Sequence, residues 1–241
     1  AMHKKEKMWT PTLVFGFLRT SNNYDDKEER LTGGRNGYGA KLANIFSRKF
    51  SVKICDSRRK KMFSQSWENN MEVCNPPSIS PTDEKESWTK VKCKVDLAKF
   101  HLESIPDFTI AMMKRRVYDI AVCNQQVKVT LNGEWINVNT EEYSKTFMTD
   151  ILFEQKNKRW HFILGLNQSG EFRQQSFVNG IWTRNGGTHV DYILSQLFNM
   201  LEPLLKKLNL RRYEVKRHLS VFVSCKLVNP TFDSQIKETC T

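Results

Sequence analysis

A glycine-rich segment constrains this chain more than any other feature of its sequence. Four glycines fall between residues 33 and 39, in the run GGRNGYGAK. Glycine lacks a Cβ atom and weakens helix and strand interiors, so this density predicts a loop with unusual backbone freedom. Leu42, Ile45 and Phe46 then recur at helical spacing. The pattern therefore predicts a helix over residues 38–49 that begins where the loop ends.

A loop that opens into a helix is suited to binding phosphate. The absence of Cβ atoms at Gly37 and Gly39 lets an anion approach the backbone N–H groups, and the helix start adds partial positive charge. Lys41 adds a full charge in the first turn. The spacing matches neither G-x-x-x-x-G-K-[ST] nor G-x-G-x-x-G. An ordinary glycine-rich turn with a helix cap explains these residues about equally well.

The charge balance points to a polyanionic partner. The 241 residues include 38 Lys+Arg and 26 Asp+Glu, for a net charge of +12. Nucleic acid, a nucleotide and an acidic membrane surface all fit this excess.

The six cysteines and five histidines show no metal-ligand spacing, so we expect reduced thiols and no metal site within these residues. No apolar run approaches the ~18 residues of a transmembrane helix.

Up to residue 150, the apolar pattern predicts a mixture of helices and strands. Residues 9–20 form an apolar run that fits a buried helix or strand, and residues 50–73 predict a β-hairpin. Alternation over residues 88–96 predicts a strand that buries Val91, Cys93 and Val95 and exposes lysines. The next two elements are a helix from Asp107 and a hairpin over residues 127–138 with Asn132-Gly133 at its turn. The helix should bury one face, which consists of Ile110, Met113, Val117, Ile120 and Ala121.

A polar stretch before residue 150 marks a domain boundary, which gives domains over residues 1–150 and 151–241. Residues 159–166, 173–183 and 219–228 predict strands in the second domain. Between the last two, leucines and other apolar residues predict a long amphipathic helix, which Pro203 should kink or restart. The order of elements predicts an α+β fold.

Four motifs occur in one order: TSNNYDD, TGGRNGYGAKLANIFS, FVNGIWTRNGGTHVDY and NPTFDSQIKE. Together they resemble the ATPase region of eukaryotic-type DNA topoisomerase II, over nearly the whole chain. The resemblance implies that residues 1–150 are the C-terminal part of a Bergerat-fold (GHKL) ATPase domain. It also implies that residues 151–241 are part of a transducer domain, an α+β two-layer fold of the ribosomal-protein-like type.

The resemblance also assigns roles to residues. It implies that the glycine loop wraps the triphosphate of ATP, and that a loop from the transducer reaches the γ-phosphate. The implied nucleotide-binding residues are Ser21, Asn22, Asn23, Gly34, Arg35, Asn36, Gly37, Tyr38, Gly39, Ala40, Lys41, Gln235, Ile236 and Lys237. Of these, Gln235 and Lys237 would act on the transferring phosphoryl group, because a flexible cation can meet the charge that develops there.

The sequence departs from the family pattern at three places. The family's general-base Glu, its Mg²⁺-binding Asn and its adenine-reading Asp-Gly-x-Gly motif are expected upstream of Ala1. We therefore expect ATP hydrolysis from a longer protein and not from these residues alone. Ile236 stands where Thr is usual, and the usual lysine run near the long helix is Lys206-Lys207-Leu208. Lys206 and Lys207 are the candidate DNA contacts.

The implied function is that of an ATP-hydrolysing type II DNA topoisomerase, an isomerase that couples ATP to double-strand passage. It implies ATP and Mg²⁺ as cofactors, double-stranded DNA and a second copy as partners, no membrane association and a nuclear location. Two alternatives stay open: another GHKL ATPase, of chaperone or mismatch-repair type, and a non-catalytic basic DNA-binding module. The sequence upstream of Ala1 would distinguish them.

Overall fold

The computed structural model describes residues 1–25 and 27–241, which form two compact units. Unit 1 comprises residues 1–25 and 34–106, and unit 2 comprises residues 27–33 and 107–241. The packing units therefore divide at Pro106/Asp107 and not near residue 150. The functional division at residue 150 stays a prediction.

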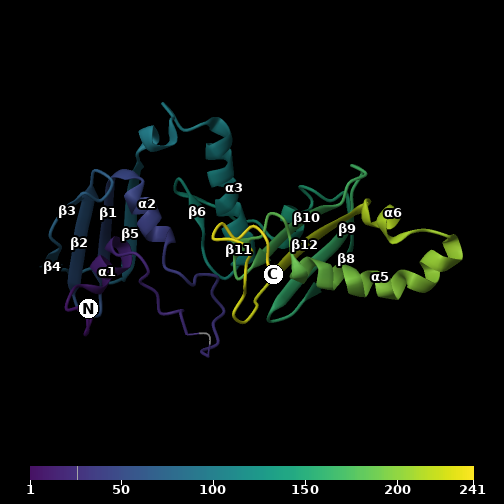
Figure 1. Cartoon of the computed structure of the whole chain (residues 1–241), viewed down its shortest axis with the longest axis horizontal. Coiled ribbons are helices and arrows are strands. Elements are labelled where there is room, and N and C mark those ends of the chain that lie inside the picture. The colour runs from purple at the N-terminus through teal and green to yellow at the C-terminus, as the bar shows by residue number, and fades with distance from the viewer. Residues whose placement is uncertain (26) are drawn as a thin grey trace. The chain divides into compact units, whose positions relative to one another are not determined.

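Unit 1 contains a five-stranded antiparallel sheet, with β3-β2-β1-β5 as its strand order and β4 also paired with β2 (Figure 1). The expected hairpin is formed by β1 and β2, and the short helices α1 and α2 precede it in the chain. The bounds are α1 Thr10–Gly16, α2 Gly39–Ile45, β1 Ser47–Asp56, β2 Lys61–Glu68, β3 Val73–Cys74, β4 Ser78–Pro81, β5 Trp88–Val95 and the 3-10 turn Leu97–Phe100.

One face of this sheet carries the core of unit 1. Phe50, Val52 and Trp67 are buried there, and Phe15 of α1 packs on Phe50 with ring centroids 6.1 Å apart. The predicted strand at residues 88–96 is confirmed as β5, but its predicted burial is wrong. Val91 is 47% exposed and Cys93 is exposed as well. The reason is that β5 is an edge strand, whereas the buried cluster lies on β1 and β2.

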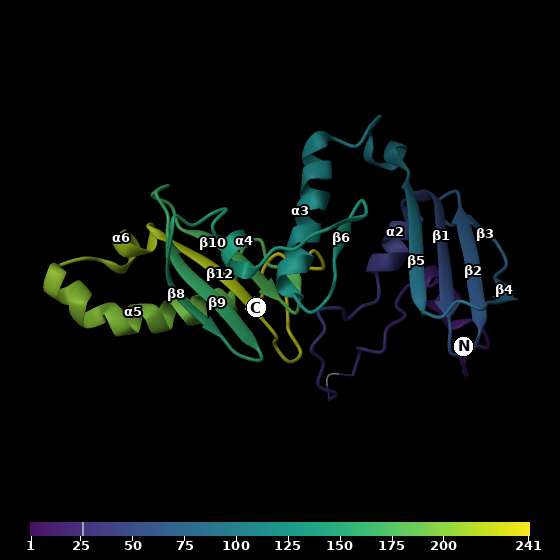
Figure 2. The ribbon, with the colours of Figure 1, turned by 180° about the vertical axis from the view of Figure 1, so that it is seen from behind.

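Unit 2 is built on a second five-stranded sheet, of order β11-β10-β12-β9-β8, in which β10 and β12 are parallel (Figure 2). The hairpin β6–β7 turns at Asn132 and Gly133, both at positive φ, as predicted. The bounds are α3 Asp107–Cys123, β6 Thr130–Leu131, β7 Glu134–Trp135, α4 Thr140–Ser144, β8 Asp150–Lys156, β9 Trp160–Leu166, β10 Arg173–Val178, β11 Ile181–Trp182, α5 Thr188–Leu208, α6 Arg212–Lys216 and β12 Leu219–Cys225.

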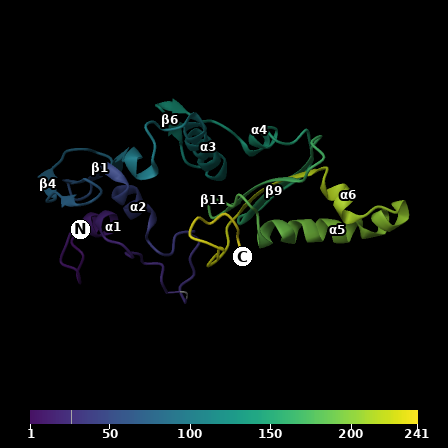
Figure 3. The ribbon, with the colours of Figure 1, turned by 45° about the horizontal axis from the view of Figure 1, so that its top comes forward.

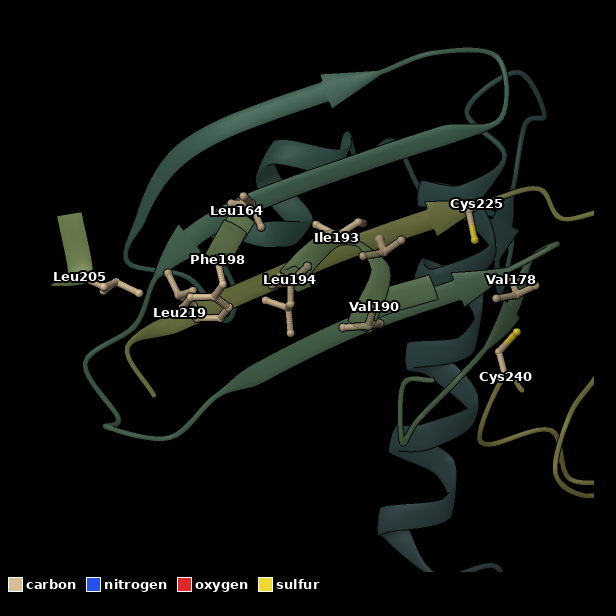
Figure 4. Packing of buried hydrophobic residues seen from close by; sticks show 12 residues of the cluster. Leu164, Val178, Val190, Ile193, Leu194, Phe198, Leu205, Leu219, Cys225 and Cys240 are labelled. Carbon is tan, nitrogen blue, oxygen red and sulfur yellow. The ribbon is translucent and has the colours of Figure 1, made fainter. Parts of the chain in front are cut away.

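Helices cover both faces of the unit 2 sheet (Figure 3). On one face, Val221 and Val223 of β12 pack in a cluster with apolar residues of α5. Figure 4 labels two other β12 residues of this cluster, Leu219 and Cys225. On the other face, Phe222 packs with Val122 of α3 and Tyr143 of α4. Residues 151–241 thus supply two layers, sheet and α5, and the third layer comes from earlier in the chain. The mixed α+β class is confirmed.

The burial predicted for α3 is wrong, and one of the two outcomes predicted for α5 is excluded. The expected apolar face of α3 is largely exposed, with Met113 at 54%, because the buried residues Asp119, Ala121 and Val122 all lie near its C-terminal end. The sequence predicted that Pro203 would kink or restart helix α5. The helix continues through Pro203 as one element, so the restart does not occur. Its apolar stripe, which packs on the sheet, holds the helix together across the missing backbone hydrogen bond.

Candidate functional site

The glycine loop of unit 1 packs against the segment that precedes it by about a dozen residues. The side-chain amide of Asn23 donates to the Gly34 carbonyl oxygen at 2.7 Å, and the Tyr24 hydroxyl donates to the Asn36 carbonyl oxygen at 3.0 Å. The Asn23 backbone N–H in turn donates to the Ser21 hydroxyl oxygen at 3.1 Å. The structure therefore brings together two of the motifs that the sequence singled out. Asp26, which ends the first motif, lies outside the described residues.

The glycines of this loop have different structural requirements. Gly37 has φ +65°, and a Cβ there would lie 2.4 Å from the Thr20 carbonyl oxygen, so the folded loop requires glycine at this position. Gly34 and Gly39 have no atom within 4 Å of the place a Cβ would take, and neither has positive φ. Packing and backbone geometry within unit 1 therefore leave these two glycines unexplained. Open space beside exposed backbone is what a bound phosphate chain needs.

Lys41 lies in the first turn of α2, as predicted, but its ammonium is turned inward. The residue is 3% exposed, and its Nζ donates to the Thr20 carbonyl oxygen at 3.2 Å. Burial lowers the pKa of this ammonium, because charge is costly away from water. The Thr20 carbonyl oxygen thus accepts a hydrogen bond from Lys41 and lies close to Gly37. The sequence gave no sign of this role, because a backbone atom of Thr20 plays it and not its side chain.

The remaining residues proposed for the nucleotide in unit 1 are placed around this loop. Asn22, Arg35 and Gly39 are exposed, and Ala40 is half-buried in the first turn of α2. The Tyr38 hydroxyl accepts a hydrogen bond from Nε of Arg19 at 2.9 Å, which raises the pKa of that guanidinium. Arg19 is a second residue that sequence reasoning missed.

A second set of candidate site residues, the triplet Gln235, Ile236 and Lys237, lies in unit 2 at the tip of a closed loop. Phe232 and Cys240 pair as a β-bridge, and the Asp233 N–H donates to the Thr239 carbonyl oxygen at 3.2 Å. Hydrogen bonds from Thr239 and Ser234 hold the pKa of Asp233 below its usual range. These contacts close the base of the loop, so Asp233 positions it.

The loop presents the Gln-Ile-Lys triplet at its tip. The Lys237 N–H donates to the Ser234 carbonyl oxygen at 3.1 Å and closes a four-residue turn. Lys237 has φ +65°, an unusual conformation for a side-chain-bearing residue, which is often found at functional sites. Gln235 is exposed, and Ile236 is 76% exposed.

Residues 27–33 pack against this same part of unit 2. The Arg30 N–H donates to the Asn229 side-chain oxygen at 3.1 Å, and the Asn229 N–H donates to the Arg30 carbonyl oxygen at 3.0 Å. Burial, and then the charge of Arg30, lower the pKa of Lys237. We call residues 27–33 the strap. The chain passes from the strap directly into Gly34 of the glycine loop. The strap was not predicted, since a polar stretch carries no pattern that names a partner 199 residues away.

Three further residues, His189, Lys206 and Lys207, lie on helix α5. His189, at the start of α5, is buried beside Thr183, with Nε2 and Oγ1 3.1 Å apart, which indicates a structural role. Lys206 and Lys207 are exposed in the last turn of α5, and Lys206 lies 3.6 Å from a Glu202 carboxylate oxygen.

Residues 1–25 and 27–241 contain no cluster of three or more His, Cys, Asp or Glu side chains that could hold a metal ion. Within the same part of the chain, no helix is both long and apolar enough to cross a membrane.

Comparison with known proteins gives one consistent answer. A sequence model described as DNA gyrase B matches residues 123–241. DNA topoisomerase 2 of Bombyx mori is 44% identical over 256 residues and that of Arabidopsis thaliana 43% over 257, each covering 100% of this chain. The ATPase and transducer domains of Balamuthia mandrillaris DNA topoisomerase II superpose with a TM-score of 0.93, at 44% identity, over 100% of this chain and 64% of that one. The ATPase region of Saccharomyces cerevisiae topoisomerase II gives the same TM-score at 40% identity, with 64% of its chain covered.

The chain belongs to the type II DNA topoisomerase family. It spans about a sixth of the length of these curated relatives, 16% for Bombyx mori and 17% for Arabidopsis thaliana. Its fold matches that of 64% of the solved ATPase and transducer domains of topoisomerase II. The resemblance read from the four motifs is thereby confirmed, and the family fold of both parts with it.

Proposed function

We propose that this chain is the nucleotide-binding and transducer part of an ATP-dependent type II DNA topoisomerase. The observation that carries the proposal is the open space beside Gly34 and Gly39 in a loop that begins a helix. A triphosphate fits there, because backbone N–H groups and the helix start attract anions. Ser21, Asn22, Asn23 and residues 34–40 would hold ATP, and Lys41, whose ammonium donates to the Thr20 carbonyl oxygen, would fix the start of α2 against residue 20.

The transducer loop supplies the second part of the proposal. Gln235 and Lys237 lie at the tip of a loop whose base is fixed, and Lys237 can bring a cation to the γ-phosphate. Ile236 has no group suited to that contact. In hydrolysis, water attacks the γ-phosphorus and the bond to the β–γ bridging oxygen breaks, which yields ADP and phosphate. The general base and the Mg²⁺ ligand would come from residues outside this chain.

The wider activity follows the family. ATP use would be coupled to passage of one DNA double strand through another, in a dimer of two copies, in the nucleus. Identity of at least 40% to topoisomerase II over the whole chain disfavours a chaperone or mismatch-repair ATPase. A purely DNA-binding role would leave the open glycines without a use.

Gly39→Ala tests the nucleotide site. In a protein that spans the relatives' ATPase region, the added methyl should weaken binding of a non-hydrolysable ATP analogue about tenfold, because it blocks close approach to the backbone. Folding should be unaffected or favoured, since alanine has the higher helix propensity. Calorimetric titration and thermal unfolding measure the two effects.

Two further variants make the test specific. Ala43→Ser adds one heavy atom to the same helix beyond its first turn and should leave affinity unchanged. Gly37→Ala should lose stability and affinity together, because the Cβ collides with the Thr20 carbonyl oxygen. Full affinity in a folded Gly39→Ala protein would remove the basis for the ATP assignment.

Lys237→Ala tests the transducer loop. An interaction made mainly in the reacting state lowers kcat more than ground-state binding, so the ATPase rate should fall on the order of a hundredfold. ADP affinity should barely change, because ADP has no γ-phosphate. Ile236→Thr serves as the control and should not raise the rate. An ADP affinity loss as large as the ATP loss would contradict the assignment.

A further inference from the structure

The face of the unit 1 sheet opposite its buried core carries rows of lysine and serine. Alternation along β1 and β5 places Lys49 and Lys53 on this face with Lys90, Lys92 and Lys94. The registers pair Ser51 with Lys92 and with Ser66, and Lys53 with Lys90 and with Ser64. Six of these residues line one depression of about 460 Å³, and we call them the lysine–serine face: Ser51, Lys53, Ser64, Ser66, Lys90 and Lys92.

Like charges oppose one another directly on this surface. Lys53 lies opposite Lys90, and Lys49 lies opposite Lys94. Directly opposed like charges destabilise an antiparallel pair. Lys49 has a carboxylate partner, Glu68, at 3.0 Å. Among residues 1–25 and 27–241, no carboxylate lies within 4.0 Å of the ammonium groups of Lys53, Lys90 or Lys92.

The arrangement fits an extended polyanion better than a small one. The Cα atoms of lysines two residues apart on β5 are about 6.8 Å apart. The neighbouring strand β1 lies about 4.8 Å from β5 and adds a second row of side chains on the same face. The three ammonium groups of the lysine–serine face, spread over two strands, cover more area than one phosphate group can contact. Serine hydroxyls between them can donate to further phosphate oxygens. Lysine as a point charge, without a base-reading element, indicates recognition of a backbone and not of a sequence.

We propose that the lysine–serine face is a second DNA-contact surface, which binds the phosphate backbone of duplex DNA without sequence preference. The choice of duplex DNA rests on the proposed function of the chain. This surface is on a different element from Lys206 and Lys207, which end α5 in unit 2. The contact with DNA would therefore be shared by both units.

The test measures the salt dependence of duplex binding by the full 241-residue chain. Each phosphate contact contributes about 0.9 to the slope of log affinity against log salt. The triple variant Lys53→Ala/Lys90→Ala/Lys92→Ala should lower the magnitude of that slope by about 2.7 for a labelled duplex followed by fluorescence anisotropy. Thermal stability should hold or rise, because the opposed charges are removed.

A matched variant distinguishes the contribution of the lysine–serine face from the effect of removing any three positive charges. Lys5→Ala/Lys85→Ala/Lys99→Ala removes three exposed lysines of unit 1 outside the face and should change the slope by less than about 1. Lys206→Ala/Lys207→Ala should lower the slope independently of the triple variant.

Three outcomes would overturn the proposal. They are equal losses in the two triple variants, no duplex binding by the unmodified chain at low salt, and full competition by tripolyphosphate at concentrations near those of the duplex. None of them depends on the nucleotide titrations of Gly39→Ala, so failure here is distinguishable from failure of the proposed function.

Discussion

The two sheets of this molecule differ in how many of their faces are covered. Strand β12 of unit 2 is buried at six of its seven positions, because clusters with α5 and with α3 and α4 pack on opposite faces. Strand β5 of unit 1 has no fully buried residue. The sequences reflect the difference: LSVFVSC is a nearly continuous apolar run, whereas WTKVKCKV alternates. A strand covered on both faces serves the core, and a strand left open can present side chains to a ligand.

The largest effect should come from the doubly covered strand. Phe222 is fully buried in β12 and contacts Tyr143 and Phe177 through its ring. Phe222→Ala should lower the free energy of unfolding of unit 2 by about 3–5 kcal/mol, because a large cavity replaces the ring. Urea unfolding followed by circular dichroism measures the change.

Phe153 provides the control for this substitution, since it lies in the same sheet but is half exposed. Phe153→Ala should cost less than about 1 kcal/mol. Equal costs for the two substitutions would contradict the view that β12 anchors unit 2.

The second-largest effect should be a dependence of the stability of unit 2 on pH. Burial lowers the pKa of His189 to about 4, so the folded state releases a proton that the unfolded state still binds below its value of 6.5. Stability contributed by neutral His189 is therefore present above pH 6.5 and is lost as the pH falls towards 4. The loss approaches about 3 kcal/mol.

His189→Gln should flatten this part of the stability curve, as measured by urea unfolding at several pH values. His101 of unit 1 is exposed, and His101→Gln should leave the curve unchanged. A curve that keeps its full slope in the His189 variant would show that other groups cause the acid sensitivity.

The smallest effect should distinguish the strands directly. Val91→Thr in the exposed β5 should change stability by at most about 0.5 kcal/mol. Val223→Thr in β12 buries a hydroxyl and should cost about 1–3 kcal/mol. Thermal unfolding of both variants gives the contrast, and a larger cost at Val91 would mean that β5 is covered in solution.

The sequence predicted the local elements well because their signals are local. Asn132-Gly133 defines its own hairpin turn, and the glycine loop with the following helix is read from neighbouring residues. Burial was predicted less well. Alternation showed that residues 88–96 form a strand, but which face is covered depends on elements elsewhere, and the same holds for Met113 and Ile120 of α3.

The candidate site divides in the same way. The residues proposed to bind ATP were assigned from motifs. The structure shows that Gly37 must be glycine, whereas it gives no packing reason for glycine at Gly34 and Gly39. The contacts of Thr20 with Lys41 and of Arg30 with Asn229 could not be predicted, because at least one partner in each hydrogen bond is a backbone atom. A carbonyl or amide group is present at every residue and leaves no trace in the sequence.

The strap sets an order of events during synthesis of the protein. Its hydrogen bonds join Arg30 to Asn229, a separation of 199 residues. At about 5–20 residues per second, a ribosome takes about 10–40 s to add that length of chain. During this interval the local contacts of the unit 1 sheet can form, but residue 30 has no Asn229 to bind. The strap is therefore fixed only after Asn229 has been synthesised, so a nascent chain can form the β-sheet of unit 1 long before residues 27–33 are held in place.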